Sequence, residues 1–301
     1  MGGDLEPRYR QATPDDAMGC HELMWSSVTD LATRQGMPLQ GTAAEWWRWS
    51  EPLNRLLAEL AAEWWVAELP TSQLVGFARS IERDGLFELT EFFVLPNQQA
   101  KGIGRALIER AFPTGRGKVR SIIATSDVRA QARYYAAGTV ARFPLFTVGG
   151  VPSETLPVHD LTAESIEGAQ AVQAQRDIER NVLGHRRSES EIRWLLARRQ
   201  GYLYRRGNRY VGFSFLGPDG AGPMAALASS DLPDILLHVE GLARSIGLER
   251  LELQVPGPNE AGVRHLISRG FRFDRWINFL MSDRPFGHFD RFIPFSPPLF
   301  L

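Results

Sequence analysis

The chain has few of the sequence features that identify several classes of protein. One cysteine in 301 residues, Cys20, excludes an internal disulfide and predicts a reducing, cytoplasmic setting. The six histidines lack ligand spacing, so no metal site is expected. A formal net charge of -1 without a long basic run argues against a nucleic-acid partner. No apolar run is long enough to cross a bilayer and no signal-peptide core is present, so no membrane partner is expected either.

The composition instead indicates a globular protein with two domains. Hydrophobic residues make up 44% of the chain and charged residues 23%, which suffices for a sizeable core. The stretch Gly149–Ser153 is a polar, glycine-bearing break between two apolar patterns. We therefore expect domains over residues 1–150 and 151–301.

The most informative stretch runs from Leu86 to Phe112. It opens with nine residues, Leu86–Val94, that are rich in aromatic and β-favouring side chains, and Pro96 follows soon after. A glycine-bearing loop then leads into a helical pattern from Ile103. A strand that feeds a loop and a helix leaves backbone N–H groups pointing at one spot, where a phosphate can bind, and Lys101 and Arg105 would add positive charge.

The spacing Gln99-x-x-Gly102-x-Gly104 after a strand ending in Val94 resembles the pyrophosphate-binding motif of the GNAT superfamily of acyl-CoA-dependent N-acetyltransferases. It fits neither the nucleotide-hydrolysing loop nor the dinucleotide fingerprint. The resemblance implies that acetyl-CoA is the acyl donor, with no metal. It also implies the following cofactor-binding residues: Phe93, Val94, Gln99, Ala100, Lys101, Gly102, Ile103, Gly104 and Arg105.

The periodicities predict an α/β fold in which each half is a mixed twisted sheet flanked by helices. In the first half we expect strands over 7–11, 63–68, 74–82, 86–94, 118–125 and 139–148, the last closing the unit, with helices over 13–34, 42–61 and 130–137. In the second half we expect strands over 156–159, 201–205, 209–216, 223–228 and 250–255. Its helices are expected to start at 161–164 and to span 188–199 and 231–247. The closing segment 289–301 is expected to pack as an extended arm.

The two halves repeat one another. Asp127 and Gly138 recur as Asn259 and Gly270 at an offset of 132 residues, which indicates two tandem copies of one GNAT-like fold. The same shift carries Gln99 and Gly102 onto Asp231 and Asp234. Carboxylates there would repel a diphosphate, and Pro233 removes a donor. The first half is thus expected to be the working domain and the second a degenerate one.

Acyl transfer to an amine needs a proton for the leaving thiolate and a group that takes the proton of the amine. By the resemblance, the proton donor is Tyr134, four residues before Gly138, and the neighbouring Tyr135 points elsewhere. The second half has Leu266 at the position of Tyr134, and leucine has no proton to give.

The resemblance places the base six or four residues before Val94, at Glu88 or Thr90, with Glu88 the leading candidate. Strand alternation predicts that both share the face of Val94 and that Glu91 lies on the opposite face. The backbone N–H of Val94 would polarise the acetyl carbonyl. Asp127 stands where many relatives have asparagine, so its contact with the pantetheine arm is in doubt.

Tryptophans could form an aromatic wall for the acceptor or simply seal the core: Trp46, Trp47, Trp49, Trp64 and Trp65. The sequence favours an N-acetyltransferase that acts on an amine of a small molecule by direct attack. The alternatives are an acyl-CoA-binding regulatory module without turnover, and a protein acetyltransferase.

Overall fold

The computed structural model describes residues 6–153 and 160–295, and it divides into two compact units. Unit 1 comprises residues 1–140 together with Ser282–Arg284, and unit 2 comprises 141–281 with 285–301. The division between Val140 and Ala141 lies earlier than the expected boundary after residue 150. None of the helices within the described ranges is long and apolar enough to span a bilayer.

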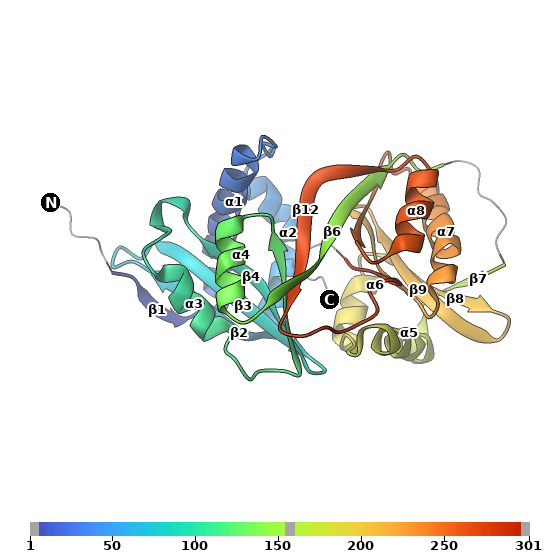
Figure 1. Cartoon of the computed structure of the whole chain (residues 1–301), viewed down its shortest axis with the longest axis horizontal. Coiled ribbons are helices and arrows are strands. Elements are labelled where there is room, and N and C mark those ends of the chain that lie inside the picture. The colour runs from blue at the N-terminus through green and yellow to red at the C-terminus, as the bar shows by residue number, and fades with distance from the viewer. Residues whose placement is uncertain (1–5, 154–159, 296–301) are drawn as a thin grey trace. The chain divides into compact units, whose positions relative to one another are not determined.

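Unit 1 is built on five neighbouring strands, which Figure 1 shows from one side. Their order in the sheet follows the chain, and every pair is antiparallel except the parallel pair β4–β5. The strands are β1 (Arg8–Gln11), β2 (Ala61–Glu68), β3 (Leu74–Arg83), β4 (Leu86–Val94) and β5 (Val119–Thr125). A parallel neighbour needs a crossover, and α3 supplies it.

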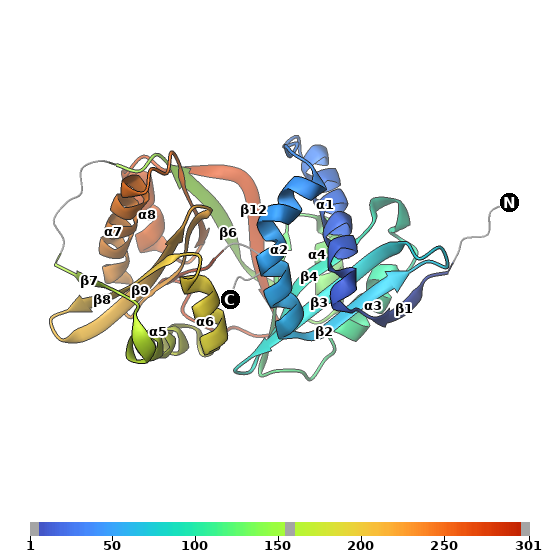
Figure 2. The ribbon, with the colours of Figure 1, turned by 180° about the vertical axis from the view of Figure 1, so that it is seen from behind.

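Helices cover both faces of this sheet. Figure 2 shows α1 (Ala17–Arg34) and α2 (Ala43–Leu60) on one face, and Figure 1 shows α3 (Ile103–Ala111) and α4 (Val128–Ala136) on the other. The start of α2 has a capping box, in which Thr42 and Glu45 satisfy each other's backbone N–H groups. The alternation of β3 sets the two sides: Arg79 donates to the Asn54 carbonyl on α2, whereas Ser80 donates to the Ala111 carbonyl on α3.

Cys20 serves the core, as expected. It is buried on α1 in a cluster with Leu23, Trp64 and Phe77. Burial raises the pKa of the Cys20 thiol to about 12, so the thiol stays neutral and unreactive at physiological pH.

The strand predicted to close the first half forms, but it joins unit 2. This strand, β6 (Val140–Gly150), pairs antiparallel with β11 (Leu251–Pro256), from Leu145–Pro256 to Gly150–Leu251. Alternation alone cannot choose a strand's partner, because the partner comes from distant sequence. The returning segment Ser282–Arg284 completes unit 1 at β5, where Asp283 accepts from the Arg120 N–H at 3.0 Å.

Unit 2 contains a five-stranded antiparallel sheet of order β13-β10-β9-β8-β7, and a second group of order β12-β6-β11. The further strands are β7 (Thr162–Ser165), β8 (Gln200–Arg206), β9 (Arg209–Gly217), β10 (Gly220–Ala226), β12 (Arg272–Ser282) and β13 (Phe292–Ile293). In Figure 2, α5 (Gly168–Leu183) and α6 (Glu189–Leu196) lie on one side of the larger sheet. A Cβ on Gly212 would meet Ile235, which places α7 (Leu232–Ser245) on the other side.

One prediction for unit 2 was wrong, and another falls outside the described residues. Residues 161–164 do not start a helix, because Thr162–Ser165 form β7 and pair with Tyr202–Arg205 of β8. The helix begins later, as α5 at Gly168, in a polar stretch whose inward face comes only every third or fourth residue. The strand predicted over 156–159 lies outside the described residues.

The internal repeat is confirmed most clearly by one helix. α8 (Glu260–Ser268) reproduces α4 at the offset that the sequence predicts. Each helix is capped by the side chain of the residue before it, Asp127 or Asn259, and each is followed by a glycine with φ of 86°, Gly138 or Gly270.

Candidate acyl-carrier site in unit 1

Strands β4 and β5 separate toward their carboxyl ends. Within the described residues their register ends at Leu89–Ile122, although β4 continues to Val94 and β5 to Thr125. The separation begins at a bulge: Arg79 of β3 pairs with Glu91 and the next residue, Ser80, pairs with Leu89, so Thr90 is an extra residue. Backbone groups of Thr90–Val94 on this edge are therefore available to a ligand. We call this region the β4–β5 splay.

The predicted phosphate loop lies beside the end of β4. After a short turn over Pro96–Gln98, Gly102 caps α3 in the left-handed conformation, with φ of 86°, and no side chain caps the helix. The first N–H groups of α3 are therefore left for a ligand. Gln99 donates to the Val94 carbonyl at 3.2 Å, which ties the loop to the strand. A Cβ on Gly104 would lie 3.0 Å from the Phe92 ring, so α3 approaches β4 closely only because this residue is glycine.

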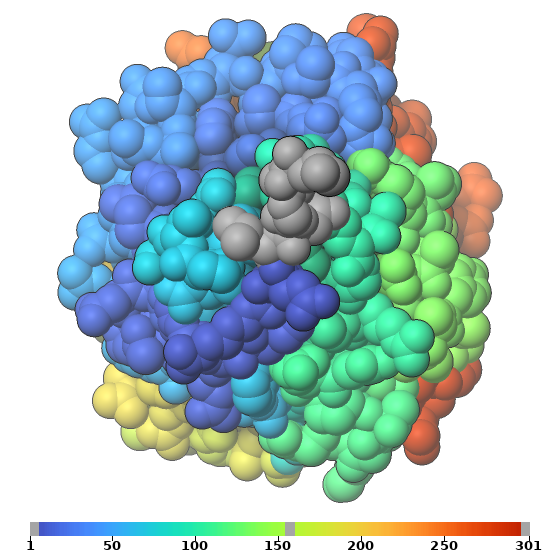
Figure 3. All heavy atoms as spheres, turned by 90° about the vertical axis from the view of Figure 1, so that its left-hand side faces the viewer, coloured from blue at the N-terminus to red at the C-terminus, as the bar shows by residue number. Residues whose placement is uncertain are grey.

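The charged side chains of the loop differ in their surroundings. Arg105 is largely exposed and pairs with Glu109 one turn along α3, at 2.7 Å, rather than with the loop. Lys101 precedes the left-handed Gly102 at an exposed position. Teal-green atoms from this part of the chain form part of the surface beside dark-blue β1 in Figure 3.

Tyr134 lies on α4 and faces β4, the strand that leads into the loop. Its ring packs edge-on against Phe92, with 5.9 Å between centroids, and burial raises the pKa of its hydroxyl above the ordinary value of 10.0. Within the described residues no hydrogen bond holds this hydroxyl. Tyr134 is therefore a protonated donor at neutral pH, next to a residue that also contacts the start of α3. Tyr135 is 51% exposed, in keeping with the prediction that it points elsewhere.

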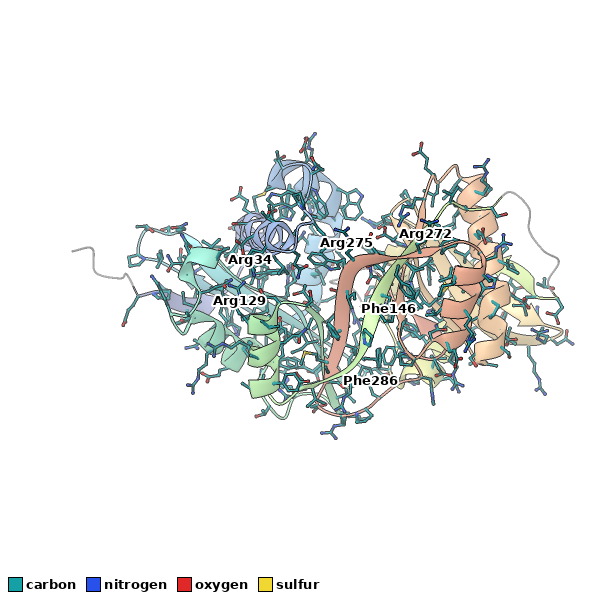
Figure 4. All side chains as sticks on the ribbon, turned by 45° about the horizontal axis from the view of Figure 1, so that its top comes forward. Arg34, Arg129, Phe146, Arg272, Arg275 and Phe286 are labelled. Carbon is teal, nitrogen blue, oxygen red and sulfur yellow. The ribbon has the colours of Figure 1, made fainter. Side chains whose placement is uncertain are left out.

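The start of α4 is a charged cluster. Asp127 caps the helix through the Arg129 N–H and pairs with the guanidinium groups of Arg129, at 2.7 Å, and Arg34, at 3.3 Å. Figure 4 shows the two arginines in neighbouring positions on α4 and α1. Burial acts to raise the pKa of Asp127, but the hydrogen bonds from Arg129 and Arg34 outweigh it and lower the pKa to about 2. Asp127 is thus an ionised structural acceptor.

The predicted faces of β4 were wrong for Glu88. Because Thr90 is an extra residue, the register pairs Glu88 with Ile81 and Glu91 with Arg79, so both carboxylates share the face of α1 and α2. Val94 pairs with Gly76 and lies on the opposite face, toward α3. The bulge reverses the alternation that a regular strand would have.

The two glutamates also differ in access. Glu88 is 1% exposed, lies where β4 and β5 are still paired, and forms a 3.1 Å ion pair with buried Arg83. Glu91 is 8% exposed and lies beyond the last β4–β5 pair. Its carboxylate accepts from Nε of the fully buried Arg79 at 2.6 Å. Sequence reasoning set Glu91 aside, and the bulge that favours it has no signal in the residue pattern.

A buried hydrogen-bond network holds Arg79 in place. Its guanidinium donates to the carbonyl and the side-chain oxygen of Asn54 on α2, both at 3.4 Å, and stacks over Trp64 at 4.6 Å. Asn54 bonds in turn to Ser50, which contacts the ring of buried His21 on α1. The orientation of Glu91 therefore depends on the packing of both helices.

The tryptophans divide between the two predicted roles. Trp64 is buried under Arg79, so it belongs to the core. Trp46 and Trp49 are exposed on α2, and Trp46 packs against Trp25 with 5.0 Å between ring centroids. An aromatic wall for the acceptor stays a prediction for these two indoles and for the half-buried Trp47 and Trp65.

The equivalent helix start in unit 2 is built differently. α7 begins after the short turn Ser229–Asp231, with Pro233 in its first turn. Asp231 is buried and accepts from Arg206 at 2.8 Å, and Asp234 lies 3.8 Å from the same guanidinium. No left-handed glycine precedes this helix in the described chain. Its start holds a carboxylate–guanidinium cluster in place of open N–H groups.

Comparisons with known proteins agree with this fold. Residues 61–138 match the family model of the acetyltransferase (GNAT) domain. A presumed acetyltransferase from Pyrococcus horikoshii is 16% identical, with a TM-score of 0.73, and the match covers 100% of this chain and 99% of that one. A GCN5-related N-acetyltransferase from Sphaerobacter thermophilus is also 16% identical, with a TM-score of 0.61 and coverage of 93% and 96%.

A tandem GNAT protein from the clavulanic acid biosynthesis pathway is 15% identical, with a TM-score of 0.55, and the match covers 94% of this chain and 99% of that chain. No curated protein matches the sequence. At these identities the likeness concerns the fold, and the matched residues 61–138 contain the β4–β5 splay, the loop and Tyr134. Residues 61–138 therefore match a GNAT acetyltransferase domain, and the chain as a whole has a tandem GNAT-like α/β fold.

Proposed function

We propose that unit 1 transfers an acetyl group from acetyl-CoA to an amine of a small-molecule acceptor by direct attack. The observation that carries this proposal is the β4–β5 splay beside a helix start capped by left-handed Gly102. The exposed strand edge suits the amide groups of an extended pantetheine arm, and the open N–H groups of α3 suit a diphosphate. In the described residues of unit 2, the equivalent helix α7 has no such start.

The cofactor would lie along the residues that the motif singles out. Val94 would offer its backbone N–H to the acetyl carbonyl, and its neighbour Phe93 ends the same strand edge. The diphosphate would face Gly102, Ile103 and Gly104, whose backbone can approach closely because two of the three residues are glycines.

The chemistry needs two proton transfers. Tyr134 would give its proton to the sulfur as the thioester bond to the acetyl carbon breaks, and its raised pKa keeps that proton available at neutral pH. For the amine, we propose Glu91 ahead of Glu88, because Glu91 lies beyond the last β4–β5 pair and Glu88 lies before it. Arg79 donates to the Glu91 carboxylate and fixes its position, which suits a carboxylate that binds an ammonium group and takes its proton through water.

The test is calorimetry with coenzyme A and acetyl-CoA, followed by thiol release from acetyl-CoA over a panel of amines. The proposal expects binding to the full chain and turnover with at least one small amine. Binding without turnover on metabolite extracts or on whole-cell protein would instead indicate a regulatory module. Turnover on protein alone would indicate a protein acetyltransferase, and no binding at all would refute the proposal.

A further inference from the structure

The end of the described chain adds a strand to unit 2. We call Phe289–Phe295 the C-terminal arm. Within it, β13 pairs antiparallel with β10, through Ile293–Met224 and Phe292–Ala225. The Ala226 N–H also donates to the Arg291 carbonyl at 3.0 Å. The arm therefore satisfies the edge of β10 that β9 leaves open.

The arm is a core element rather than a surface strap. Ile293 is 0% exposed and belongs to the main cluster of unit 2, with Leu253 and Val255 of β11 among its members. Asn259, which caps α8, donates to the Phe292 carbonyl at 3.4 Å. The arm thus joins β10 to β11 and to the start of α8.

Other residues of unit 2 leave space for the arm or contact it directly. Gly222 has φ of 123°, and a Cβ there would collide with the Pro294 carbonyl, so only glycine lets the arm pass. The Arg199 guanidinium lies 3.8 Å from the centroid of the Phe295 ring and donates to the carbonyls of Gly220 and Gly222 at 2.9 and 3.1 Å. The arm therefore contacts the start of β10 and the residue before β8, in addition to the contacts above.

The internal repeat shows which place in unit 1 corresponds to the place of the arm in unit 2. The order β10, α7, β11, α8 in unit 2 repeats the order β4, α3, β5, α4 in unit 1. In unit 1 the edge of β4 toward β5 is open beyond Leu89, and in unit 2 the corresponding edge of β10 carries β13. The arm therefore occupies the place that we assign to the pantetheine arm in unit 1.

We propose that the C-terminal arm is a built-in occupant of the degenerate cofactor site, so that unit 2 depends on this segment of its own chain where unit 1 takes acyl-CoA. The comparison with unit 1 rests on the proposed function. The dependence of unit 2 on the arm does not, because it follows from pairing and burial alone.

The first test compares two isoleucines of unit 2 in the full chain. Ile293→Asp places a charge in the core, whereas Ile267→Asp changes a residue on α8 that is 50% exposed. We expect Ile293→Asp to lower the midpoint of thermal unfolding by roughly 5 °C or more relative to Ile267→Asp. If Ile293→Asp gives no folded protein, Ile293→Ala against Ile267→Ala gives the same comparison. Equal midpoints would overturn the proposal.

The second test counts coenzyme A sites by calorimetry. We expect one site in the wild-type chain and the same single site, with weaker affinity, in Gly102→Glu, because only unit 1 has an unoccupied site. Two sites per chain, or one site whose affinity Gly102→Glu leaves unchanged, would overturn the arm as an occupant. If the wild-type chain binds nothing, the proposed function fails, whereas the thermal comparison still decides whether unit 2 depends on the arm.

Discussion

Two glycines of unit 1 offer a matched test of the phosphate loop. Gly102 and Gly115 both have φ of 86°, and neither has any atom within 4 Å of where a Cβ would lie. Replacing either by glutamate therefore imposes the same backbone strain and the same charge, without a steric clash. Only Gly102 lies at the start of α3, whereas Gly115 follows its end.

The expected losses follow from these positions. A non-glycine residue in the left-handed region costs roughly 1–2 kcal/mol, so both variants should lose about that much stability. A carboxylate about 4 Å from a diphosphate charge adds roughly 1–4 kcal/mol of repulsion, depending on the effective dielectric. Because each 1.4 kcal/mol is a factor of ten in affinity, Gly102→Glu should weaken coenzyme A binding by roughly fivefold at the lower bound and several hundredfold at the upper bound. Gly115 lies beyond the nine residues of α3, about 13 Å along its axis, where salt screens the charge.

Calorimetry at physiological salt measures both variants. We expect Gly115→Glu to bind coenzyme A within about twofold of the wild type, while its unfolding midpoint falls as far as that of Gly102→Glu. Equal affinity in the two variants would refute the reasoning. It would mean either that the helix start is not the diphosphate site, or that the loop refolds around the ligand.

Three further predictions concern the proposed chemistry. Tyr134→Phe should lower kcat about 100-fold without changing the unfolding midpoint, and Tyr135→Phe should leave both unchanged; equal kcat values would refute the acid role. Glu91→Gln should lower kcat/KM for the amine more than Glu88→Gln does, as initial rates can show, and the reverse order would restore Glu88 as the base. Asp127→Ala should destabilise the chain by roughly 1 kcal/mol at pH 7. Because folding lowers the pKa of Asp127 to about 2 from 3.8, thermal unfolding should show this difference shrinking below about pH 4 and vanishing only below about pH 2.

Local signals predicted most of unit 1. Helix caps and strand breakers act within a few residues, so they can be read from the sequence. Thr42 and Glu45 indicate the start of α2. Pro96 indicates the end of β4, and Gly102 the start of α3. The loop and Tyr134 lie where the motif predicts. Their roles stay predictions.

The sequence did not predict which strands and segments pair with one another. The bulge at Thr90 depends on how β3 and β4 pair, and it moved Glu88 to the other face from Val94. The partner of β6 and the insertion of the C-terminal arm depend on contacts between distant residues. Residue pattern within one element carries no information on such pairing.

The repeat separates what the fold needs from what the chemistry needs. Asp127 and Asn259 both cap their helices, and Gly138 and Gly270 both end them in the left-handed conformation, so these pairs serve the scaffold in both units. The helix starts and strand edges differ instead. Unit 1 has Gly102 and an open β4, whereas unit 2 has Asp231 and a β10 covered by the arm. The buried edge of β10 takes its partner from the arm, whereas the open edge of β4 is left for water or a ligand, so we expect only unit 2 to lose stability when the arm is disrupted.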